Sequence, residues 1–163
     1  MKAVSLSAGY LPGAIGKIAE LHGTYYHQHW NFGLFFESKV ATELSEFLNR
    51  FDSAHDGFWL ARAQDQIVGA IAIDGNQAST TGARLRWFIL DPAYQGQGIG
   101  NLLMRAAMQF CEQAGFKRVY LTTFAGLDTA RHLYEKWDFR LCEEEQDTHW
   151  GKAVMEQVFE RLS

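Results

Sequence analysis

The segment formed by residues 84–115 constrains the fold more than any other part of the sequence. Its first part, residues 84–91, has a nearly all-apolar core, as is typical of a central strand that is buried on both faces. A glycine-rich stretch, residues 95–100, follows it. After this stretch, four apolar residues recur at the spacing of one helix face: Ile99, Leu103, Ala106 and Phe110. Gly115 is suited to end this helix. A buried strand that leads through a glycine turn into an amphipathic helix predicts an α/β fold with a central sheet.

Hydrophobic periodicity places further strands and helices on both sides of this unit. We expect strands at residues 3–7, 57–62, 66–74, 84–91, 119–124 and 139–144, of which the second and third form a hairpin. Further helices are expected from Pro12 to about Trp30, over residues 37–51 and over residues 130–137. The apolar residues of 153–161 fit a strand or a helix equally well, so this segment is left open.

Length, charge and cysteine content limit the function classes. A chain of 163 residues is expected to form a single domain over residues 1–163. Its net charge of −4 argues against a broad nucleic-acid surface, which needs a basic excess. The two cysteines, Cys111 and Cys142, do not indicate a disulfide scaffold. No apolar stretch has the length of a signal peptide or a membrane span. We therefore expect a cytoplasmic protein that binds neither nucleic acid nor membrane.

The glycine-rich stretch has the features of an anion-binding loop. Backbone N–H groups at the start of a helix point at one spot, the helix dipole adds positive potential there, and glycines let an anion approach closely. A P-loop would end in Gly-Lys-Ser/Thr, whereas Gly98 is followed by Ile99, Gly100 and Asn101. A dinucleotide fingerprint has the spacing G-x-G-x-x-G, whereas this loop has G-x-G-x-G. The loop predicts a phosphate site of another kind, and a simple tight turn is the alternative.

Two stretches of the sequence resemble the GNAT superfamily of N-acetyltransferases. Gln95-x-x-Gly98-x-Gly100 is similar to the Gln/Arg-x-x-Gly-x-Gly/Ala loop with which that family binds the pyrophosphate of coenzyme A. Residues 130–139, ARHLYEKWDF, resemble the family's A-x-x-L-Y-E-K-x-G-F motif. The resemblance implies a GNAT-like fold, with a central mixed, mostly antiparallel twisted sheet of about six or seven strands flanked by about four helices. It also implies acetyl-CoA as co-substrate, held by Phe88, Ile89, Leu90, Gln95, Gly96, Gln97, Gly98, Ile99, Gly100, Asn101, Leu127, Ala130 and Arg131.

The C-terminal part and two single positions qualify this resemblance. The tail, with Trp150-Gly151 and Glu156-Gln157, is similar to a subgroup often fused to a winged-helix regulator, although these residues contain no DNA-binding domain. Leu127 stands where many members have an Asn that bonds to coenzyme A, so that bond is lost. Asp138 stands where the family has Gly. Because Asp adopts the left-handed conformation at a helix end at some cost, we expect a structural effect there.

Tyr134 is the catalytic residue that the resemblance implies. Acetyl transfer from a thioester to an amine needs a neutral amine, a donor for the developing oxyanion and a proton for the leaving thiolate. A phenol is protonated at neutral pH and can donate to a thiolate. The expected oxyanion donor is a backbone N–H near Ile89 or Leu90, where the resemblance also implies a bulge that separates strand 84–91 from strand 119–124. A tyrosine that only packs is the structural alternative.

The general base and the acceptor remain open in the sequence. The candidate bases are Glu37, His29 and Asp91. The candidate contacts for the acceptor are Tyr25, Tyr26, His29, Trp30, Arg84 and Arg86. The aromatic residues suit an amine with an apolar part, or ordinary packing. The two arginines share one strand face and could hold a substrate carboxylate or form salt bridges. No metal is expected, because His27 and His29 point to nearly opposite sides of a helix.

The leading hypothesis is an acetyl-CoA-dependent N-acetyltransferase that modifies a primary amine of a small molecule, peptide or protein by direct attack. The alternative is a non-catalytic acyl-CoA-binding sensor, which would share the loop and would not need Tyr134. A homodimer is common in the family, although no residue here indicates one.

Overall fold

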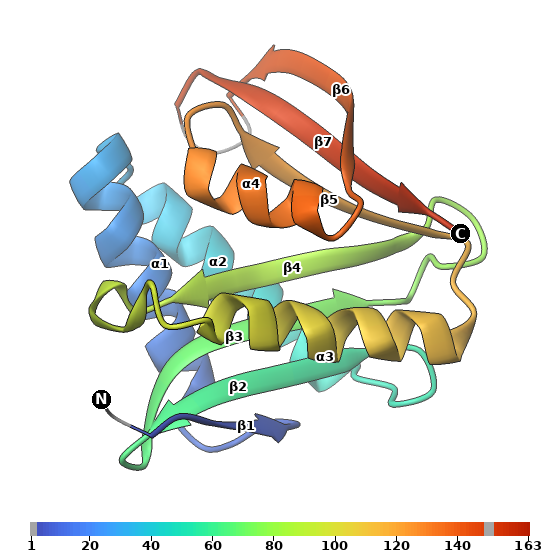
Figure 1. The fold of residues 1–163 in the computed structure, drawn as a ribbon. Helices are drawn as coiled ribbons and strands as arrows, with labels where there is room; N and C mark the ends of the chain where they lie inside the picture. The colour runs from blue at the N-terminus through green and yellow to red at the C-terminus, as the bar shows by residue number, and fades with distance from the viewer. Residues whose placement is uncertain (1–2, 149–151) are drawn as a thin grey trace.

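The computed structural model describes residues 3–148 and 152–163 of the chain. It has one seven-stranded sheet in the order β1-β2-β3-β4-β5-β7-β6, with helices on both of its faces (Figure 1). The strands are β1 (Ser5–Ala8), β2 (Gly57–Ala63), β3 (Gln66–Asp74), β4 (Ala83–Leu90), β5 (Arg118–Phe124), β6 (Arg140–Asp147) and β7 (Val154–Leu162). The helices are α1 (Ala14–Trp30), α2 (Leu34–Asn49), α3 (Ile99–Ala114) and α4 (Asp128–Lys136), with a short 3₁₀ turn at Pro92–Tyr94. The predicted fold class is confirmed.

All neighbouring strands of this sheet are antiparallel except β4 and β5, which run parallel. The predicted hairpin joins β2 to β3 through Gln64 and Asp65, which both have positive φ. A parallel pair needs a crossover connection, and α3 supplies it between β4 and β5. The loop that enters this crossover is therefore the glycine-rich one, at the carboxyl end of β4.

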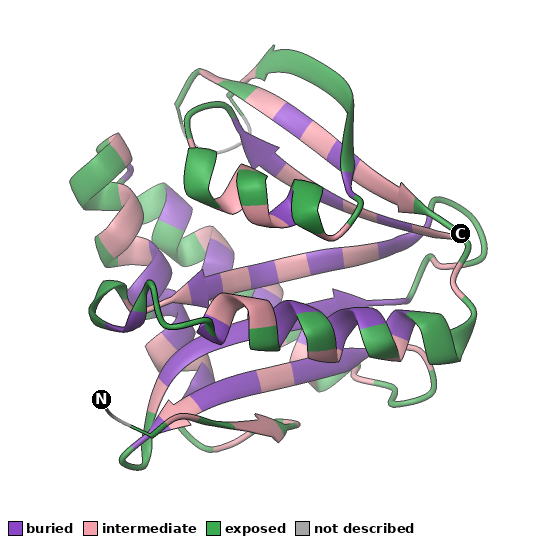
Figure 2. Cartoon of the chain, in the orientation of Figure 1, coloured by how far each residue is buried: buried purple, intermediate pink, exposed green. Residues whose placement is uncertain are grey.

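Two hydrophobic clusters lie on the two faces of the sheet. One packs α1 and α2 against β2, β3 and β4, around Leu44, Phe47 and Trp87. The other packs α3 and α4 against the opposite face, around Leu103, Met104 and Phe159. Figure 2 shows that the central strands are the most buried part of the chain, while β6 is exposed along its length. The sheet is thus a layer between two pairs of helices.

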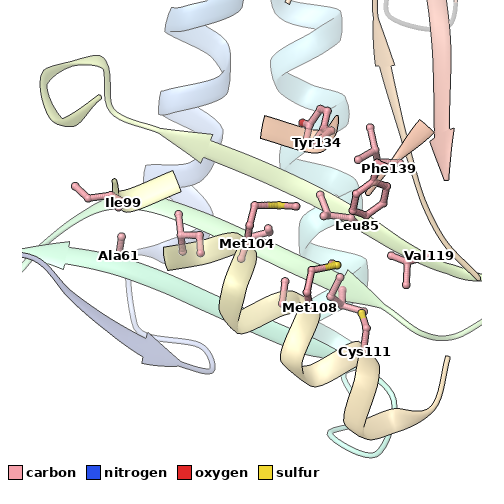
Figure 3. Packing of buried hydrophobic residues seen from close by; sticks show 14 of the residues in the cluster. Ala61, Leu85, Ile99, Met104, Met108, Cys111, Val119, Tyr134 and Phe139 are labelled. Atoms are coloured by element: carbon pink, nitrogen blue, oxygen red, sulfur yellow. The ribbon is translucent and has the colours of Figure 1, made fainter. Parts of the chain in front are cut away.

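The buried face of α3 differs from the predicted one. Ile99 and Leu103 are buried as expected, whereas Ala106 and Phe110 are only half-buried. The other fully covered residues of this helix are Met104, Ala107, Met108 and Cys111, several of which Figure 3 shows directed at the sheet. Phe110 packs at the side of the helix, against Trp59 and Phe116. The periodicity located the helix correctly and gave two of its buried positions, and Met and Cys side chains fill the rest of the buried face.

Helices α1 and α2 begin at other residues than the sequence predicted. Helix α1 begins at Ala14, after a left-handed Gly13, and α2 begins at Leu34 instead of residue 37. The two helices approach each other closely at Gly23, where an added Cβ would lie 2.5 Å from the Glu37 carboxylate. The glycine inside α1 therefore has a packing role.

The open segment at residues 153–161 is a strand, β7. It pairs with β5 on one side and with β6 on the other. Gln157 and Phe159 are buried, whereas Glu156, Val158 and Glu160, which alternate with them, are only half-buried, so the alternation of a strand is present. The segment is a strand because of its tertiary contact with β5. It pairs with an edge of β5 whose backbone N–H and C=O groups would otherwise lack hydrogen bonds to a neighbouring strand.

Candidate functional site

Strand β4 contains a bulge in its middle. Ala70 of β3 pairs with Ile89 and Ala72 pairs with Arg86, so Trp87 and Phe88 together lie opposite one residue. Trp87 has a φ of 48°, which is a strained conformation for a bulky side chain. Its ring packs on the α2 side against Phe47. Phe88 faces the other side of the sheet, toward Tyr134 of α4.

Beyond its first residues, β4 separates from β5. The parallel pairing covers only Ala83 with Val119 and Arg84 with Tyr120. Figure 1 shows the two strands diverging from this point, while β5 keeps its antiparallel partner β7 along its length. Within the described residues 3–148 and 152–163, no strand therefore lies beside the β5-facing edge of β4 after Arg84. An unpaired edge of this kind offers backbone groups to an extended ligand.

The glycine loop connects this edge to the start of α3. The Asp91 carboxylate accepts a hydrogen bond of 3.0 Å from the Ala93 backbone N–H and so fixes the turn after β4. Gly98 has a φ of 80° and occupies the N-cap of α3 without a side-chain cap. The first backbone N–H groups of a helix have no partner within it. At the start of α3 these groups, with the helix dipole, form an anion-binding position.

A first cavity, here the loop cavity, lies beside this loop and has a volume of about 200 Å³. It is formed where β4, the glycine loop and the start of α4 meet. The predicted cofactor-binding residues that line it are Phe88, Ile89, Leu90, Gln95, Gly96, Gly98, Ile99, Gly100, Leu127 and Ala130. Tyr25 and Tyr26 of α1, two of the proposed acceptor contacts, also line it. The structure thus brings most of the proposed coenzyme A contacts into one hollow.

Three of the proposed coenzyme A residues lie outside the lining of the loop cavity. The Gln97 side chain is exposed. The Asn101 side chain accepts a hydrogen bond of 3.0 Å from the Trp137 indole and so ties α3 to α4. Arg131 lies over the Phe159 ring and beside Glu135. Asn101 and Arg131 therefore have structural contacts of their own.

A second cavity, here the central cavity, lies between the diverging strands and helices α1 and α2, with a volume of about 110 Å³. Tyr26 and Phe88 line both cavities. Arg84 and Arg86, two of the proposed acceptor contacts, line the central cavity. The two cavities therefore adjoin at the bulge of β4.

Tyr134 lines the central cavity from the side of α4. Its side chain is buried, and its ring lies 6.2 Å from the Phe88 ring and 6.3 Å from the Phe139 ring, centroid to centroid. Figure 3 shows Tyr134 beside Phe139, on the same side of the sheet as Leu85 and α3. Burial raises the pKa of the phenol. The group therefore stays protonated at neutral pH and is suited to donate a proton.

The three candidate general bases lie apart from the central cavity. Asp91 caps its turn, Glu37 is exposed beside Gly23, and exposed His29 packs on Tyr25. Trp30, the remaining predicted acceptor contact, packs edge-on against Phe124. Neither His29 nor Trp30 lines the two cavities.

The other polar residues of the central cavity had no acceptor or catalytic role in the prediction. They are Thr122 and Thr123 of β5 and, from the helices, His22 of α1 and Lys39 and Glu43 of α2. The His22 Nδ1 atom lies 2.8 Å from the Ile18 carbonyl oxygen, so this nitrogen carries the proton and the other one is an acceptor. Burial lowers the pKa of His22 to about 4, so the ring is neutral at neutral pH. Only the packing of α1 and α2 on the sheet brings the helix residues to the cavity.

The described ranges 3–148 and 152–163 contain no group of three or more His, Cys, Asp or Glu side chains placed to hold a metal ion. None of the helices in those ranges combines the length and apolar character that crossing a membrane requires.

Comparison with solved structures identifies the class of fold. An acetyltransferase from Streptococcus agalactiae superimposes with a TM-score of 0.76 at 19% identity, over 100% of both chains. A ribosomal L7/L12 alpha-N-protein acetyltransferase in complex with coenzyme A superimposes with a TM-score of 0.72 at 13% identity, over 99% of this chain and 96% of the other. At such identities the likeness is one of fold, and the fold is that of the GNAT acetyltransferases.

The sequence comparison establishes the family. Residues 17–139 match the Acetyltransferase (GNAT) family, and this range covers most of the chain, so the chain belongs to that family. Among curated relatives, an N-acetylaspartate synthetase from Danio rerio is 33% identical over 90 residues, which are 55% of this chain and 32% of the synthetase. N-acetyltransferase 8F1 from Rattus norvegicus is 31% identical over 98 residues, which are 58% of this chain and 44% of the relative. The matches thus span less than half the length of these relatives.

The likeness of the tail to proteins fused to a winged-helix regulator stays a prediction. Trp150-Gly151, one half of that likeness, lies outside the described residues. Glu156 and Gln157 belong to β7 and pair with Phe124 and Thr123 of β5. Their positions are those of ordinary sheet residues.

Proposed function

We propose that the protein transfers the acetyl group of acetyl-CoA to a primary amine by direct attack. The observation that carries this proposal is that the loop cavity and the central cavity adjoin at Tyr26 and Phe88, with Tyr134 beside the junction. A donor that enters along the glycine loop and an acceptor in the central cavity would meet there.

The chain offers two sets of groups for the donor. The unpaired N–H groups at the start of α3, next to Gly98 and Gly100, suit the pyrophosphate of coenzyme A. The free edge of β4 beyond Arg84 suits the amide groups of the pantetheine arm, because an extended chain can add to an open sheet edge. A solved structure of similar fold is described as a complex with coenzyme A, which supports this assignment.

The proposed transfer forms one bond and breaks another. The amine nitrogen bonds to the thioester carbonyl carbon, and the carbon–sulfur bond breaks. The proton of the Tyr134 phenol passes to the departing thiolate sulfur, and the proton that the amine nitrogen loses passes to water and returns to the phenol. A backbone N–H at the bulge of β4, near Ile89 or Leu90, would hold the carbonyl oxygen as it becomes negative. Because burial raises the pKa of the phenol, the group carries its proton at neutral pH before this step.

The central cavity favours the neutral form of a bound amine. Lys39, Arg84 and Arg86 line it together with one carboxylate, that of Glu43, which leaves an excess of positive charge, and like charges lower the pKa of an ammonium group. His22 is neutral and adds no charge. The attack requires the free electron pair of a neutral amine nitrogen. The cavity therefore promotes the reaction even though none of the predicted bases lies within it.

The acceptor is proposed as an amine of a small molecule or a peptide. The names of relatives and structural neighbours include an N-acetylaspartate synthetase and an enzyme that acts on a ribosomal protein, so the family name alone does not choose between these classes. A cytoplasmic location and a homodimer stay predictions from the sequence.

The test is release of free coenzyme A in the presence of a panel of amines, with Tyr134→Phe as the variant. The phenyl ring keeps the packing against Phe88, Phe139 and Phe159, so the melting temperature and the affinity for acetyl-CoA should change little. The rate constant kcat should fall by about 100-fold or more, because the loss of a general acid costs roughly that factor. Tyr10→Phe, at an exposed tyrosine, is the matched control and should keep full activity.

The same assay separates the enzyme from the acyl-CoA sensor. A sensor would bind acetyl-CoA and release no coenzyme A with any amine. Full kcat in Tyr134→Phe would leave the enzyme assignment intact and remove Tyr134 from the mechanism.

A further inference from the structure

The central cavity is basic, although the chain as a whole carries a charge of −4. Three cations line it, namely Lys39, Arg84 and Arg86, together with one carboxylate, that of Glu43. His22 is neutral. A hollow with a local excess of positive charge in an acidic protein indicates a ligand with negative charge.

Two of the three cations are already neutralised by carboxylates of the protein. Lys39 forms an ion pair with Glu43, which lies one helical turn away on α2. Arg86 contacts Glu43 with one terminal nitrogen and Asp74 with the other, and its guanidinium lies 4.1 Å from the centre of the Trp87 ring. Asp74 is held in addition by Arg50, at 2.6 Å. These contacts form a closed network that fixes Arg86 in place.

Arg84 acts on that network through its charge. Against the effect of burial, it lowers the pKa of the Glu43 carboxyl together with Lys39 and Arg86. In residues 3–148 and 152–163, Arg84 forms no ion pair, and its buried Nε atom has no hydrogen-bond partner. It lies two residues before Arg86, on the same face of β4. Burial, and then the charge of Arg84, lower the pKa of the Arg86 guanidinium, so the two cations are close enough to repel. An unpaired guanidinium nitrogen beside a second cation is costly in a protein interior unless an anion joins it.

We propose that the acceptor amine carries a carboxylate and that Arg84 binds this carboxylate. This inference rests on the proposed acetyl transfer and names its acceptor class, a small amino acid or a closely related amino carboxylate. A guanidinium matches a carboxylate with two parallel hydrogen bonds. The cavity volume of about 110 Å³ is smaller than the roughly 150 Å³ of a cavity that holds benzene, so the acceptor is small.

The position of Arg84 also orients the acceptor. Arg84 is the last β4 residue that pairs with β5, whereas Tyr134 and Phe88 line the same cavity beside the opening of the strands. A carboxylate at Arg84 leaves the amine of a short molecule free to point toward this opening. Arg84 is thus a specificity residue, and Arg86 holds the protein side of the cavity together.

The experiment compares matched acceptors in the full chain. Small L-amino acids are paired with their carboxamides, which keep the shape of the carboxyl group, lack its charge and have a less basic amine, and with the amines that lack the carboxyl group. Wild-type protein should show a kcat/KM at least tenfold higher for the acid than for the amide. Arg84→Gln should reduce this ratio to about one, and Arg84→Lys should keep part of it. Arg62→Gln, on β2 outside both cavities, is the matched control and should keep the wild-type ratio.

Isothermal titration with the same acids and amides, in the presence of coenzyme A, provides a readout that needs no turnover. A tenfold preference for the acid in wild type that Arg84→Gln abolishes supports the inference. Equal affinity for acid and amide, no binding of either, or an unchanged preference in Arg84→Gln overturns it. If amides are acetylated as well as acids, the inference fails and the acetyltransferase stands. If no amine is acetylated while acids bind through Arg84, the proposed function fails and the carboxylate site stands. If Arg84→Gln does not fold, the wild-type ratio of kcat/KM for acid and amide still tests the preference for a carboxylate, and Arg84→Lys tests the role of Arg84.

Discussion

Two glycines with similar backbone conformation allow the role of the anion loop to be separated from its effect on folding. Gly98 begins α3 with a φ of 80°, and Gly115 ends the same helix with a φ of 74°. At both positions an added Cβ would meet no atom of the protein within 4 Å. Substitution with Ala therefore introduces backbone strain and no steric overlap at either end of the helix.

The cost in stability should be similar for Gly98→Ala and Gly115→Ala. A non-glycine residue in the left-handed region costs roughly 1 kcal/mol. For a chain of this size, about 1 kcal/mol lowers the melting temperature by roughly 2–4 °C. Both variants should fold and melt slightly below wild type.

The effect on the donor should differ strongly between the two variants. At Gly98 the new methyl group would stand where the pyrophosphate approaches the backbone N–H groups. Loss of one hydrogen bond to a charged group costs about 1.5–3 kcal/mol, which weakens binding roughly 10- to 150-fold. At Gly115, the opposite end of α3, the methyl group is remote from both cavities.

The assay is isothermal titration with acetyl-CoA, combined with thermal melting in the absence of ligand. We expect an increase in Kd of at least tenfold for Gly98→Ala, and a wild-type Kd for Gly115→Ala at the same loss of stability. Equal Kd values in the two variants would show that the loop only turns the chain, and the assignment of the anion site would be wrong.

Two further predictions concern stability. Burial lowers the pKa of His22 from 6.5 to about 4 against the effect of its bond to Ile18, so the unfolded chain takes up a proton between these pH values that the folded chain does not. The stability of wild type should therefore be complete above pH 6.5 and fall by up to about 3 kcal/mol as the pH drops to 4. In denaturant unfolding, the free energy of unfolding of His22→Asn should lose this pH dependence, whereas that of the exposed-site variant His29→Asn should keep it. Parallel curves of unfolding free energy against pH for wild type and His22→Asn would refute the assignment. Asp138 ends α4 with a φ of 70°, so Asp138→Gly should raise the free energy of unfolding by about 0.5–1 kcal/mol; a decrease would contradict the strain argument.

The sequence predicted the parts of this molecule that depend on local patterns. The apolar core of β4, the turn at Gly96 and Gly98, and Gly115 at the end of α3 are all visible in the order of residues, and the structure has them where they were expected. The positive φ of Asp138 was expected from its place after a helix. These features follow from backbone conformation and alternation, which act over a few residues.

The parts that depend on distant segments could not be predicted in the same way. The strand form of β7 follows from the open edge of β5, and the buried face of α3 depends on how the helix lies on the sheet. Lys39 and Glu43 have the spacing of a simple surface pair on a helix, and only the packing of α2 brings Glu43 to Arg86. From sequence alone, Arg84 and Arg86 of β4 could either bind a substrate carboxylate or form salt bridges. The structure pairs Arg86 with protein carboxylates, whereas Arg84 forms no ion pair with any residue in the described part of the chain.

The most direct test of acetyl transfer is a quantitative comparison of two products in one reaction. Protein, acetyl-CoA and a panel of small amino acids and simple amines are incubated, free coenzyme A is measured by its thiol, and N-acetylated amine is measured by mass spectrometry. We predict equal amounts of the two products with at least one amine, and a loss of both in Tyr134→Phe. Binding of acetyl-CoA without formation of any N-acetylated amine, or release of coenzyme A that does not depend on an amine, would contradict the account.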